Sequence, residues 1–503
     1  MIDEATIASI VAQVVKNLQQ QQAGSGTITP AAAVTSCSGT CRSATTPGST
    51  DGVADCQVGG TSAHGDRGVY SDLEAAIQAA KAAQKELVNL SLATRKEIIT
   101  AIRQAAIDNV EAIAKLAHAE TGYGRVEDKI QKKLYAARLT PGVEDLKTEA
   151  ISGDHGLILI ERAPFGLIAA IEPATHPGSC VINHAISMVA AGNSIVFLPH
   201  PQGLKTTQYL VRLFNDAIQQ AGGPADLLVV GDKVSLENLD LVLGHPDVDL
   251  IVATGGPEVV GRALKSGKKA IAAGPGNPPV VVDETVSDLN YAAQCIVAGA
   301  AFDNTVLCIA EKVIIAVEQI ADELLYHLQD HGAYLVRDEG DKEKLMRALL
   351  PAGQTFNPEL IGKDAAVILK AAGLDAPANT RIAVLECPPE HPLVQKEQLL
   401  PVLPLVRVPD FAAAMELAVE VEHGFKHTAL IHSQDVSRIT AYARKLQTDI
   451  LVANASSAAG LHIGGEGHFS HTIASPTGEG ICTPRTYTRE QRTVIAGALR
   501  TVD

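Results

Sequence analysis

The chain contains 503 residues, of which 46% are hydrophobic and only 3% aromatic, and its formal net charge is −16. This length allows a large buried core divided between lobes, while the negative charge argues against nucleic acid or an anionic membrane as a partner. No apolar run approaches the ~20 residues of a membrane span. The eight cysteines are too sparse for a disulfide scaffold, which fits a reducing cytosol.

The N-terminal segment, residues 1–20, is predicted to form a separate amphipathic helix with Asp3 as its N-cap. Apolar side chains recur at the spacing of one helical face: Ile7, Ile10, Val11, Val14, Val15 and Leu18. Residues 21–67 are rich in Gly, Ser, Thr and Pro, a composition that cannot bury enough apolar surface to order itself. We therefore expect a short helix on a flexible linker.

Three of the cysteines, Cys37, Cys41 and Cys56, lie in this linker. The C-x3-C spacing of the first two is compatible with a metal site, but no fourth ligand is evident, the nearest imidazole being that of His64. We interpret the three as linker thiols and predict no metal in the protein.

The globular part is predicted to begin with helices. Residues 71–74 have the pattern of a capping box that starts at Ser71, and Ala-rich segments with helical periodicity continue to about Ala137. Residues 149–156 then have the composition of a hairpin turn that leads into a strand, within a hairpin region of about 140–162.

From Gly166 onward, short apolar runs alternate with helical stretches, which is typical of a parallel sheet covered on both faces. The first set of predicted strands is 167–171, 194–198, 227–230 and 250–253. The second set is 280–283, 313–317, 381–385, 428–432 and 449–453. We therefore predict an α/β protein with two parallel-sheet lobes, over residues 68–272 and 273–465, followed by a C-terminal segment over 466–503.

Cys308 lies between two predicted elements, because residues 289–301 have helical spacing and a β-branched strand follows at 313–317. A thiol in such a connecting loop can face a cleft while rigid elements hold its backbone, and its thiolate attacks carbonyl carbon readily. A free cysteine can equally be a small buried hydrophobe. The segment alone makes Cys308 a candidate nucleophile and leaves both interpretations open.

Three phrases, taken with their order and spacing, resemble the aldehyde dehydrogenase superfamily. They are Phe302-Asp-Asn with Cys308-Ile-Ala-Glu-Lys312, then Ala272-Ala-Gly-Pro-Gly-Asn-Pro-Pro279, and Pro476-Thr-Gly-Glu-Gly-Ile-Cys-Thr-Pro-Arg485. The resemblance runs from about Tyr70 to the C-terminus, and it is to the CoA-acylating propionaldehyde and acetaldehyde dehydrogenases of bacterial microcompartments. It implies an aldehyde dehydrogenase-like fold in which the first lobe binds the cofactor, the second is catalytic, and the hairpin serves oligomerisation. The C-terminal segment is expected to return to the cofactor lobe.

The resemblance implies NAD as the cofactor, at the carboxyl ends of the first lobe's strands. The residues expected to contact it are Ile171, Pro173, Thr254, Gly255, Gly256, Val259, Gly274 and Glu397. The two glycines after Thr254 allow backbone amides to approach a phosphate, and Pro257 suits the first turn of a helix. Leu198 stands where many relatives have a lysine at the adenosine ribose, so no charged contact is predicted there. Glu397 matches a glutamate that holds the nicotinamide ribose.

The resemblance gives Cys308 the role of attacking the aldehyde and carrying a thioester. Thr175 stands where the family has an asparagine that helps to hold the substrate oxygen. The expected donors to this oxygen are therefore the Cys308 backbone N–H, the Thr175 hydroxyl and the Asn304 side chain. His176 is interpreted as a structural histidine, and the sequence identifies no base for the CoA thiol.

The absence of a general-base glutamate decides whether water or a thiol is expected to receive the acyl group. Hydrolytic relatives carry a glutamate that activates water, and Ala273 occupies that position here. A positioned base contributes about 10²–10⁴-fold, so the thioester should wait for coenzyme A. The predicted reaction is the NAD-dependent oxidation of a short aliphatic aldehyde, propionaldehyde first and acetaldehyde next, to acyl-CoA. A hydrolytic enzyme that releases a free acid and a non-catalytic assembly protein are the alternatives, with a phosphorylating reductase more distant.

Residues 1–20 resemble the encapsulation peptides that direct enzymes into bacterial microcompartments. We therefore expect an enzyme of the bacterial cytoplasm that is held in a microcompartment by shell or core proteins. The alternative is a helix that folds back on its own body. The hairpin and the C-terminal segment favour a homo-oligomer, either a dimer or a tetramer.

Overall fold

The computed structural model describes residues 65–351, 353 and 355–502. The expectations for the helix over residues 1–20, for the linker up to residue 64 and for Cys37, Cys41 and Cys56 lie outside the described residues. Within the described part of the chain, no helix has both the length and the apolar character that crossing a membrane requires.

The cofactor lobe is built on a six-stranded sheet with the strand order β1-β6-β5-β4-β7-β8, and every pairing in it is parallel. Its strands are β1 (Val69–Tyr70), β4 (Leu167–Glu172), β5 (Ser194–Pro199), β6 (Leu228–Gly231), β7 (Leu250–Thr254) and β8 (Ala270–Ala273). The strands are short and almost fully buried, as expected for a sheet with helices on both faces.

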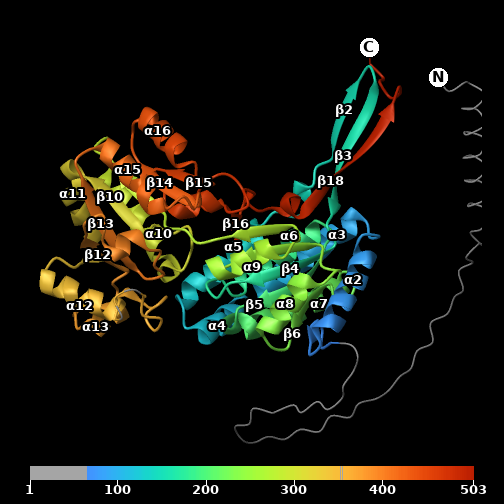
Figure 1. Ribbon diagram of the computed structural model, residues 1–503, viewed down its shortest axis with the longest axis horizontal. Coiled ribbons are helices and arrows are strands. Elements are labelled where there is room, and N and C mark those ends of the chain that lie inside the picture. The colour runs from blue at the N-terminus through green and yellow to red at the C-terminus, as the bar shows by residue number, and fades with distance from the viewer. Residues whose placement is uncertain (1–64, 352, 354, 503) are drawn as a thin grey trace, which may run out of the picture. The chain divides into compact units, whose positions relative to one another are not determined.

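Alternate residues of β4 divide the core of this lobe between the two faces of the sheet. Ile168 and Ala170 pack in a cluster with α3, α5, α6 and α7, whereas Leu167 and Ala169 pack in a cluster with α2, α8 and α9. The helices of the lobe are α2 (Leu73–Leu87), α3 (Leu92–Asp108), α4 (Val110–Thr121), α5 (Val126–Leu139), α6 (Ser179–Ala190), α7 (Leu204–Gln220), α8 (Leu236–Gly244) and α9 (Pro257–Lys265). Figure 1 shows these helices around the sheet.

The catalytic lobe contains a seven-stranded parallel sheet with the order β11-β12-β13-β10-β9-β14-β15. Its strands are β9 (Pro279–Val282), β10 (Val313–Val317), β11 (Ala333–Leu335), β12 (Ile382–Glu386), β13 (Val402–Val408), β14 (Thr428–His432) and β15 (Ile450–Ala453). The two sheets confirm the predicted α/β fold with two parallel-sheet lobes.

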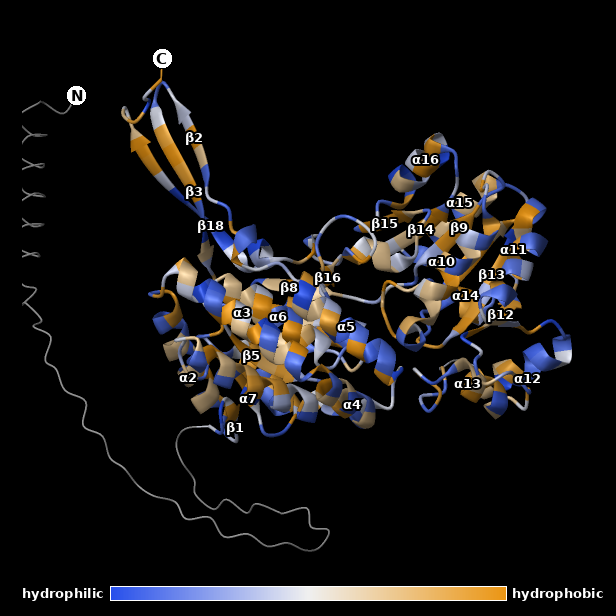
Figure 2. Cartoon of the chain, turned by 180° about the vertical axis from the view of Figure 1, so that it is seen from behind, coloured by the Kyte–Doolittle hydropathy of each residue, from blue (hydrophilic) through white to orange (hydrophobic). Residues whose placement is uncertain are grey.

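Helices again cover both faces of the second sheet. Ile314 and Ala316 of β10 pack in a cluster with α10 and α11, and Ile315 packs in a cluster with α12, α13, α15 and α16. The helices are α10 (Leu289–Ala301), α11 (Glu318–Asp330), α12 (Glu339–Leu349), α13 (Ala365–Ala371), α14 (Pro392–Gln395), α15 (Phe411–Glu422) and α16 (Val436–Leu446). Figure 2 shows hydrophobic residues gathered along the strands of both sheets and hydrophilic residues on the outer sides of the helices.

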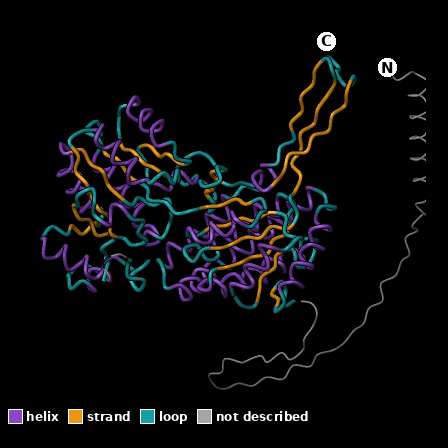
Figure 3. The backbone as a smooth tube through the Cα atoms, viewed as in Figure 1, coloured by secondary structure: helices purple, strands orange, loops and turns teal. Residues whose placement is uncertain are grey.

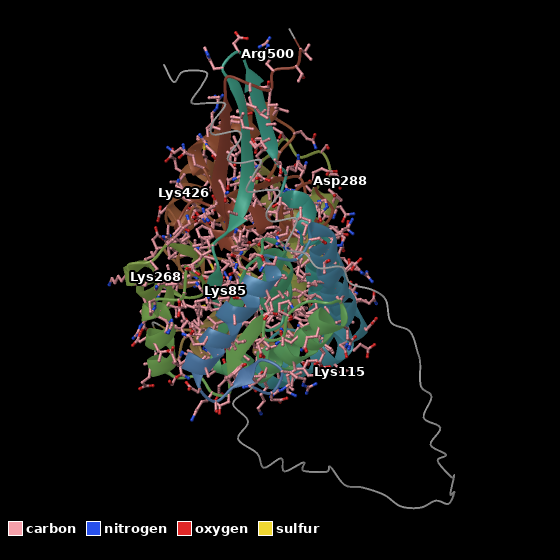
Figure 4. The ribbon with its side chains drawn as sticks, turned by 90° about the vertical axis from the view of Figure 1, so that its right-hand side faces the viewer. Lys85, Lys115, Lys268, Asp288, Lys426 and Arg500 are labelled. Atoms are coloured by element: carbon pink, nitrogen blue, oxygen red, sulfur yellow. The ribbon has the colours of Figure 1, made fainter. Side chains whose placement is uncertain are left out.

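A separate antiparallel sheet of order β18-β3-β2 projects from the cofactor lobe, as the tube in Figure 3 shows. Its strands are β2 (Glu149–Gly153), β3 (Gly156–Pro164) and β18 (Thr488–Ala496). β18 pairs with β3 over its whole length, so the C-terminal segment reaches the hairpin. At the tip, Arg500 pairs with Asp154 at 2.8 Å (Figure 4).

The rest of the C-terminal segment lies against the cofactor lobe. It forms β16 (Ile473–Ala474), which pairs with β17 (Gly480–Ile481), and the short 3-10 helix η5 (Pro484–Tyr487). His184 of α6 contacts the Thr472 hydroxyl at 2.7 Å, and the Asn193 amide donates to the Tyr487 carbonyl at 2.9 Å.

Two local expectations need correction. The N-cap of α2 is Asp72 and not Ser71, because the Asp72 carboxylate accepts the Glu74 backbone N–H at 2.9 Å. The segment 149–156 is not all turn, because β2 and β3 pair from Glu149 up to Gly156 and leave only residues 154 and 155 between them. The sequence pattern also did not predict β1, β8, β11 or β13.

Candidate active site

A cleft of about 630 Å³ is lined by the carboxyl ends of strands in the cofactor lobe and by the segments before the amino ends of strands in the catalytic lobe. In the cofactor lobe, its residues follow the carboxyl ends of β4, β5 and β7. In the catalytic lobe, they precede the amino ends of β10, β13 and β14. The lining includes Ile171, Pro173, Thr175, Leu198, Thr254, Gly255, Gly256 and Val259 from the first lobe, and Cys308, Glu397, Leu399 and His427 from the second. Gly274, in the link between β8 and β9, also lines it.

The cleft therefore brings together every residue singled out from the sequence except Asn304, which does not line it. The Asn304 side-chain amide instead donates to the Gly362 carbonyl at 2.9 Å and to the Asp364 carboxylate at 2.8 Å. This placement gives no support to the expectation that Asn304 holds the substrate oxygen. Its amide is used to join the turn before Cys308 to the loop near residue 362.

That turn is strained, and side chains hold it in place. The 3-10 segment η3 (Phe302–Thr305) has three consecutive non-glycine residues at positive φ: Asp303 (48°), Asn304 (56°) and Thr305 (66°). Such backbone angles cost energy and persist only where surrounding contacts fix them. The Thr305 hydroxyl donates to the Ala300 carbonyl at 2.6 Å, and Lys312 Nζ donates to the Thr305 carbonyl at 2.7 Å.

Asp303 is held by buried lysines of α5. Its carboxylate pairs with Lys129 at 3.2 Å and with Lys132, and it accepts the Arg125 backbone N–H at 3.0 Å. Asp303 and Lys129 are both fully buried, so loss of the Asp303 carboxylate would leave the buried charges of Lys129 and Lys132 uncompensated inside the protein. The result is a rigid base for the loop that carries Cys308.

Cys308 is partly exposed to the cleft and faces buried ionisable groups. Burial raises the pKa of its thiol to about 12, with the Glu397 carboxylate acting in the same direction and the Lys312 ammonium against it. Burial also raises the pKa of Glu397 and lowers the pKa of Lys312 to about 8. The thiol is therefore protonated in the free protein at neutral pH.

The turn after β7 fits a polar, phosphate-bearing ligand such as NAD. The Thr254 hydroxyl is buried without a hydrogen-bond partner among the described residues, although Thr254 lines the cleft. Gly256 is the N-cap of the nine-residue helix α9 and supplies no side-chain cap, and a Cβ placed on it would meet no atom within 4 Å. An unpaired hydroxyl beside open helix amides is suited to binding an anion.

Ala273 is buried at the end of β8 and lines the cleft, so no carboxylate occupies this position. Among the described residues that line the cleft, the carboxylic acids are Glu172 and Glu397. Glu172 is bonded to His184 Nδ1 at 2.7 Å, and Glu397 accepts the Gly276 backbone N–H at 3.4 Å. Each of these two carboxylates thus already has a protein partner.

His427 is a cleft residue that the sequence did not reveal. It precedes β14, and a Cβ placed on Gly276 would lie 3.0 Å from His427 Cγ and 3.0 Å from the Cys308 carbonyl oxygen, so the two residues flank Gly276. His427 Nδ1 contacts the Thr428 hydroxyl at 2.8 Å, and Nε2 is buried without a partner in the described structure. Burial lowers the pKa of His427 to about 4, aided by the Lys312 charge, so the ring is neutral. Its position directly before a predicted strand was the available signal.

Comparison with known proteins places this geometry in a family. The aldehyde dehydrogenase family matches residues 53–468. An acetaldehyde dehydrogenase (acetylating) of Escherichia coli is 44% identical over 440 residues, which cover 86% of this chain and 94% of that protein. A propanal dehydrogenase (CoA-propanoylating) of Salmonella typhimurium is 43% identical and covers 85% of this chain and 92% of its own.

Solved structures agree with the sequence relatives. The propionaldehyde dehydrogenase of Rhodopseudomonas palustris with bound propionyl-CoA superposes with a TM-score of 0.85 at 44% identity, covering 87% of this chain and 97% of the other. Another structure of that enzyme contains CoA and an acylated cysteine. A propionaldehyde dehydrogenase from a fucose utilisation microcompartment of Clostridium phytofermentans also gives a TM-score of 0.85 at 44% identity, covering 86% of this chain and 100% of the other. With this coverage and identity, the chain belongs to the aldehyde dehydrogenase family.

Proposed function

We propose that this protein is a CoA-acylating aldehyde dehydrogenase that oxidises a short aliphatic aldehyde to acyl-CoA through a thioester on Cys308. The observation that carries the proposal is a cleft lined both by the partly exposed Cys308 and by an alanine at residue 273. Relatives at 42–44% identity are named as acetylating or CoA-propanoylating enzymes, which supports the same reaction.

The protein groups have distinct roles in this reaction. Cys308 sulfur adds to the aldehyde carbonyl, and the Cys308 backbone N–H together with the Thr175 hydroxyl donates to the oxygen that becomes negative. NAD, when bound, supplies the acceptor for the hydride. Thr254, Gly256 and Glu397 would hold it, the first two towards its phosphates and the carboxylate towards its nicotinamide ribose. We expect NAD in preference to NADP, because among the described residues the cleft lining contains no arginine, and its one lysine, Lys233, follows β6 and not the β7 turn.

The thioester then needs a thiol. We assign His427 as the base that takes the proton from CoA, since its buried ring is neutral and Nε2 has no protein partner in the described structure. In the tautomer that donates Nδ1–H to Thr428, the Nε2 lone pair is free. The CoA sulfur attacks the thioester carbonyl, the bond to Cys308 breaks, and acyl-CoA leaves.

The aldehyde itself is short. One methylene changes binding in an apolar pocket by roughly 1–3 kcal/mol, so propionaldehyde and acetaldehyde should both react. We propose propionaldehyde as the preferred substrate. Comparison of kcat/KM for the two aldehydes tests this, and a higher value for acetaldehyde would reverse the assignment.

The test of the reaction is direct observation of the thioester. Incubation of the purified chain with NAD and propionaldehyde should give a propionyl adduct on the Cys308 peptide in mass spectrometry, and CoA should remove the adduct and release propionyl-CoA. Free propionate at the same rate with and without CoA would favour the hydrolytic alternative.

We also propose that the enzyme works inside a bacterial microcompartment, through residues 1–20, and as a homo-oligomer. The support is a relative whose name places it in a microcompartment, and the apolar side chains Ile151 (61% exposed) and Val494 (67% exposed) on the projecting sheet. Fusion of residues 1–20 to a fluorescent protein should carry it into co-expressed shells. Light scattering of the chain should give a dimer or tetramer, and Ile151→Glu with Val494→Glu should lower that mass.

A further inference from the structure

His176, in the loop after β4, has one ring nitrogen committed to a buried lysine. Lys132 on α5 is only 2% exposed, and its Nζ contacts three groups, namely the Asp303 carboxylate, the Thr175 carbonyl at 3.3 Å and His176 Nδ1 at 3.2 Å. An ammonium group has three N–H donors and no acceptor. Because each contact uses one donor, His176 Nδ1 must accept, and the ring proton lies on Nε2.

The His176 ring is also held in place and uncharged. It stacks on His471 with the ring centroids 5.1 Å apart and an interplanar angle of 27°, and His471 packs edge-on against Phe469. Burial lowers the pKa of His176 well below its usual value, with the Lys132 charge and His471 acting in the same direction. The ring is therefore a neutral imidazole with a fixed orientation.

The protonated nitrogen is available to a ligand. His176 lines the cleft that contains Cys308, and its Nε2 has no hydrogen-bond partner among the described residues. His471 Nε2 is unpartnered and fully buried, whereas His176 Nε2 is not fully buried. An N–H group that reaches the cleft and lacks a protein acceptor can donate to substrate.

The substrate oxygen still needs such a donor. The Asn304 amide donates to Gly362 and Asp364, away from the cleft, which leaves the Cys308 backbone N–H and the rotatable Thr175 hydroxyl. Fixed donors stabilise a developing oxyanion best because they need no reorganisation when the charge forms. The Thr175 hydroxyl can rotate, whereas the hydrogen bond from Lys132 to His176 Nδ1 fixes the direction of the His176 Nε2–H.

Resting on the proposed function, we propose that His176 donates its Nε2–H to the carbonyl oxygen of the aldehyde as Cys308 attacks, and that Lys132 is the positioning residue that fixes this tautomer. The Cys308 thiol gives its proton to solvent, the sulfur–carbon bond forms, the carbonyl π electrons move to oxygen, and the His176 N–H stabilises that charge without transferring its own proton. His176 cannot serve as the base for CoA, because its free nitrogen already carries hydrogen. His427, whose Nε2 can be unprotonated, takes the opposite role.

The kinetic test uses the burst of NADH formed from propionaldehyde and NAD without CoA, which reports acylation alone. His176→Leu should lower the burst rate constant about 10²–10³-fold with little change in the KM for aldehyde, and His176→Asn, which keeps an N–H donor, should recover at least about tenfold of that loss. His432→Leu is the matched control, since it removes another buried imidazole at the far end of β14 and outside the cleft, and its burst should match wild type.

The proposal is overturned if His176→Leu keeps the wild-type burst, if it changes only the KM, or if His176→Asn is as slow as His176→Leu. Ring nitrogen NMR of histidine-labelled enzyme, with His176→Asn to assign the signal, should show a protonated Nε2 and an unprotonated Nδ1. A protonated Nδ1 would exclude the role given to Lys132. Absence of any burst in wild type would instead reject the proposed function, so the two failures are distinct.

Discussion

The two lobes contribute to the cleft through opposite ends of their parallel strands. The cofactor lobe presents the turns after β4, β5 and β7, where α/β sheets usually bind ligands; the turn after β7 supplies Gly255, Gly256 and the Thr254 hydroxyl, and the loop after β4 supplies Thr175 and His176. The catalytic lobe presents the segments before β10, β13 and β14, and these carry Cys308, Glu397 and His427. The turn after β7 is suited to binding through backbone groups, and the catalytic-lobe edge is suited to chemistry through buried ionisable side chains.

This difference predicts how variants should divide. Changes on the cofactor-lobe edge should act on KM for NAD, whereas changes on the catalytic-lobe edge should act on rate constants. Thr175 and His176, in the loop after β4, are the exceptions, because both are proposed to contact the substrate oxygen; His176 is also coupled through Lys132 to the Asp303 turn that supports Cys308.

The largest effect is expected for Cys308→Ala. Removal of the nucleophile should lower turnover by on the order of 10⁴-fold or more, as the loss of a covalent catalyst does elsewhere. NAD binding, measured by isothermal titration calorimetry, should persist because the cofactor-lobe edge is untouched. Substantial residual turnover would mean that another group carries the reaction.

His427→Leu should slow the CoA-dependent step by about 10²–10⁴-fold, the usual contribution of a general base. The NADH burst without CoA should stay close to wild type, because acylation of Cys308 does not use His427. Rapid-quench measurement of propionyl-CoA formation separates the two steps. Equal slowing of both steps would show that His427 has a structural role instead.

The pH dependence of thiol reactivity should follow the raised pKa of Cys308. In the free protein the thiolate fraction rises almost tenfold per pH unit below a pKa of about 12, so alkylation by iodoacetamide should accelerate about 10²-fold from pH 7 to pH 9. Mass spectrometry of the Cys308 peptide gives the rate. A plateau starting below pH 8 would show that the thiol is activated before any ligand binds.

The smallest effect is expected for Thr254→Val, on the binding edge. Loss of one hydrogen bond of about 0.5–1.5 kcal/mol should raise the KM for NAD between about twofold and tenfold and leave kcat unchanged. Thr206→Val is a control of the same chemistry outside the cleft, where the hydroxyl bonds Glu120. A change in kcat for Thr254→Val would contradict the division between the two edges.

The sequence predicted the two parallel sheets because most of their strands are continuous apolar runs. It missed β13 because Pro404 lies inside this internal strand, where proline is normally excluded, and it missed β8 because Ala270–Ala273 has no β-branched residue but Ile271. β1 and β11 are two and three residues long, too short to leave a pattern.

The sequence predicted those site residues whose role depends on the few residues on either side of them. Cys308, Thr254 and the glycines after it lie in recognisable turns and do line the cleft. The structure gives no support to the role predicted for Asn304, whose amide partners, Gly362 and Asp364, are about 60 residues away in the chain. His427 and Lys132 were missed because distant packing decides their roles: His427 reaches the cleft at the start of β14, and Lys132 of α5 contacts His176 behind the cleft.

The central claim is tested most directly by NADH formation from propionaldehyde and NAD, with and without CoA. The account predicts a burst of about one NADH per active site without CoA and steady turnover only when CoA is present, because Ala273 stands where hydrolytic relatives have the glutamate that activates water. Steady turnover without CoA at a comparable rate would contradict it and would identify a hydrolytic enzyme.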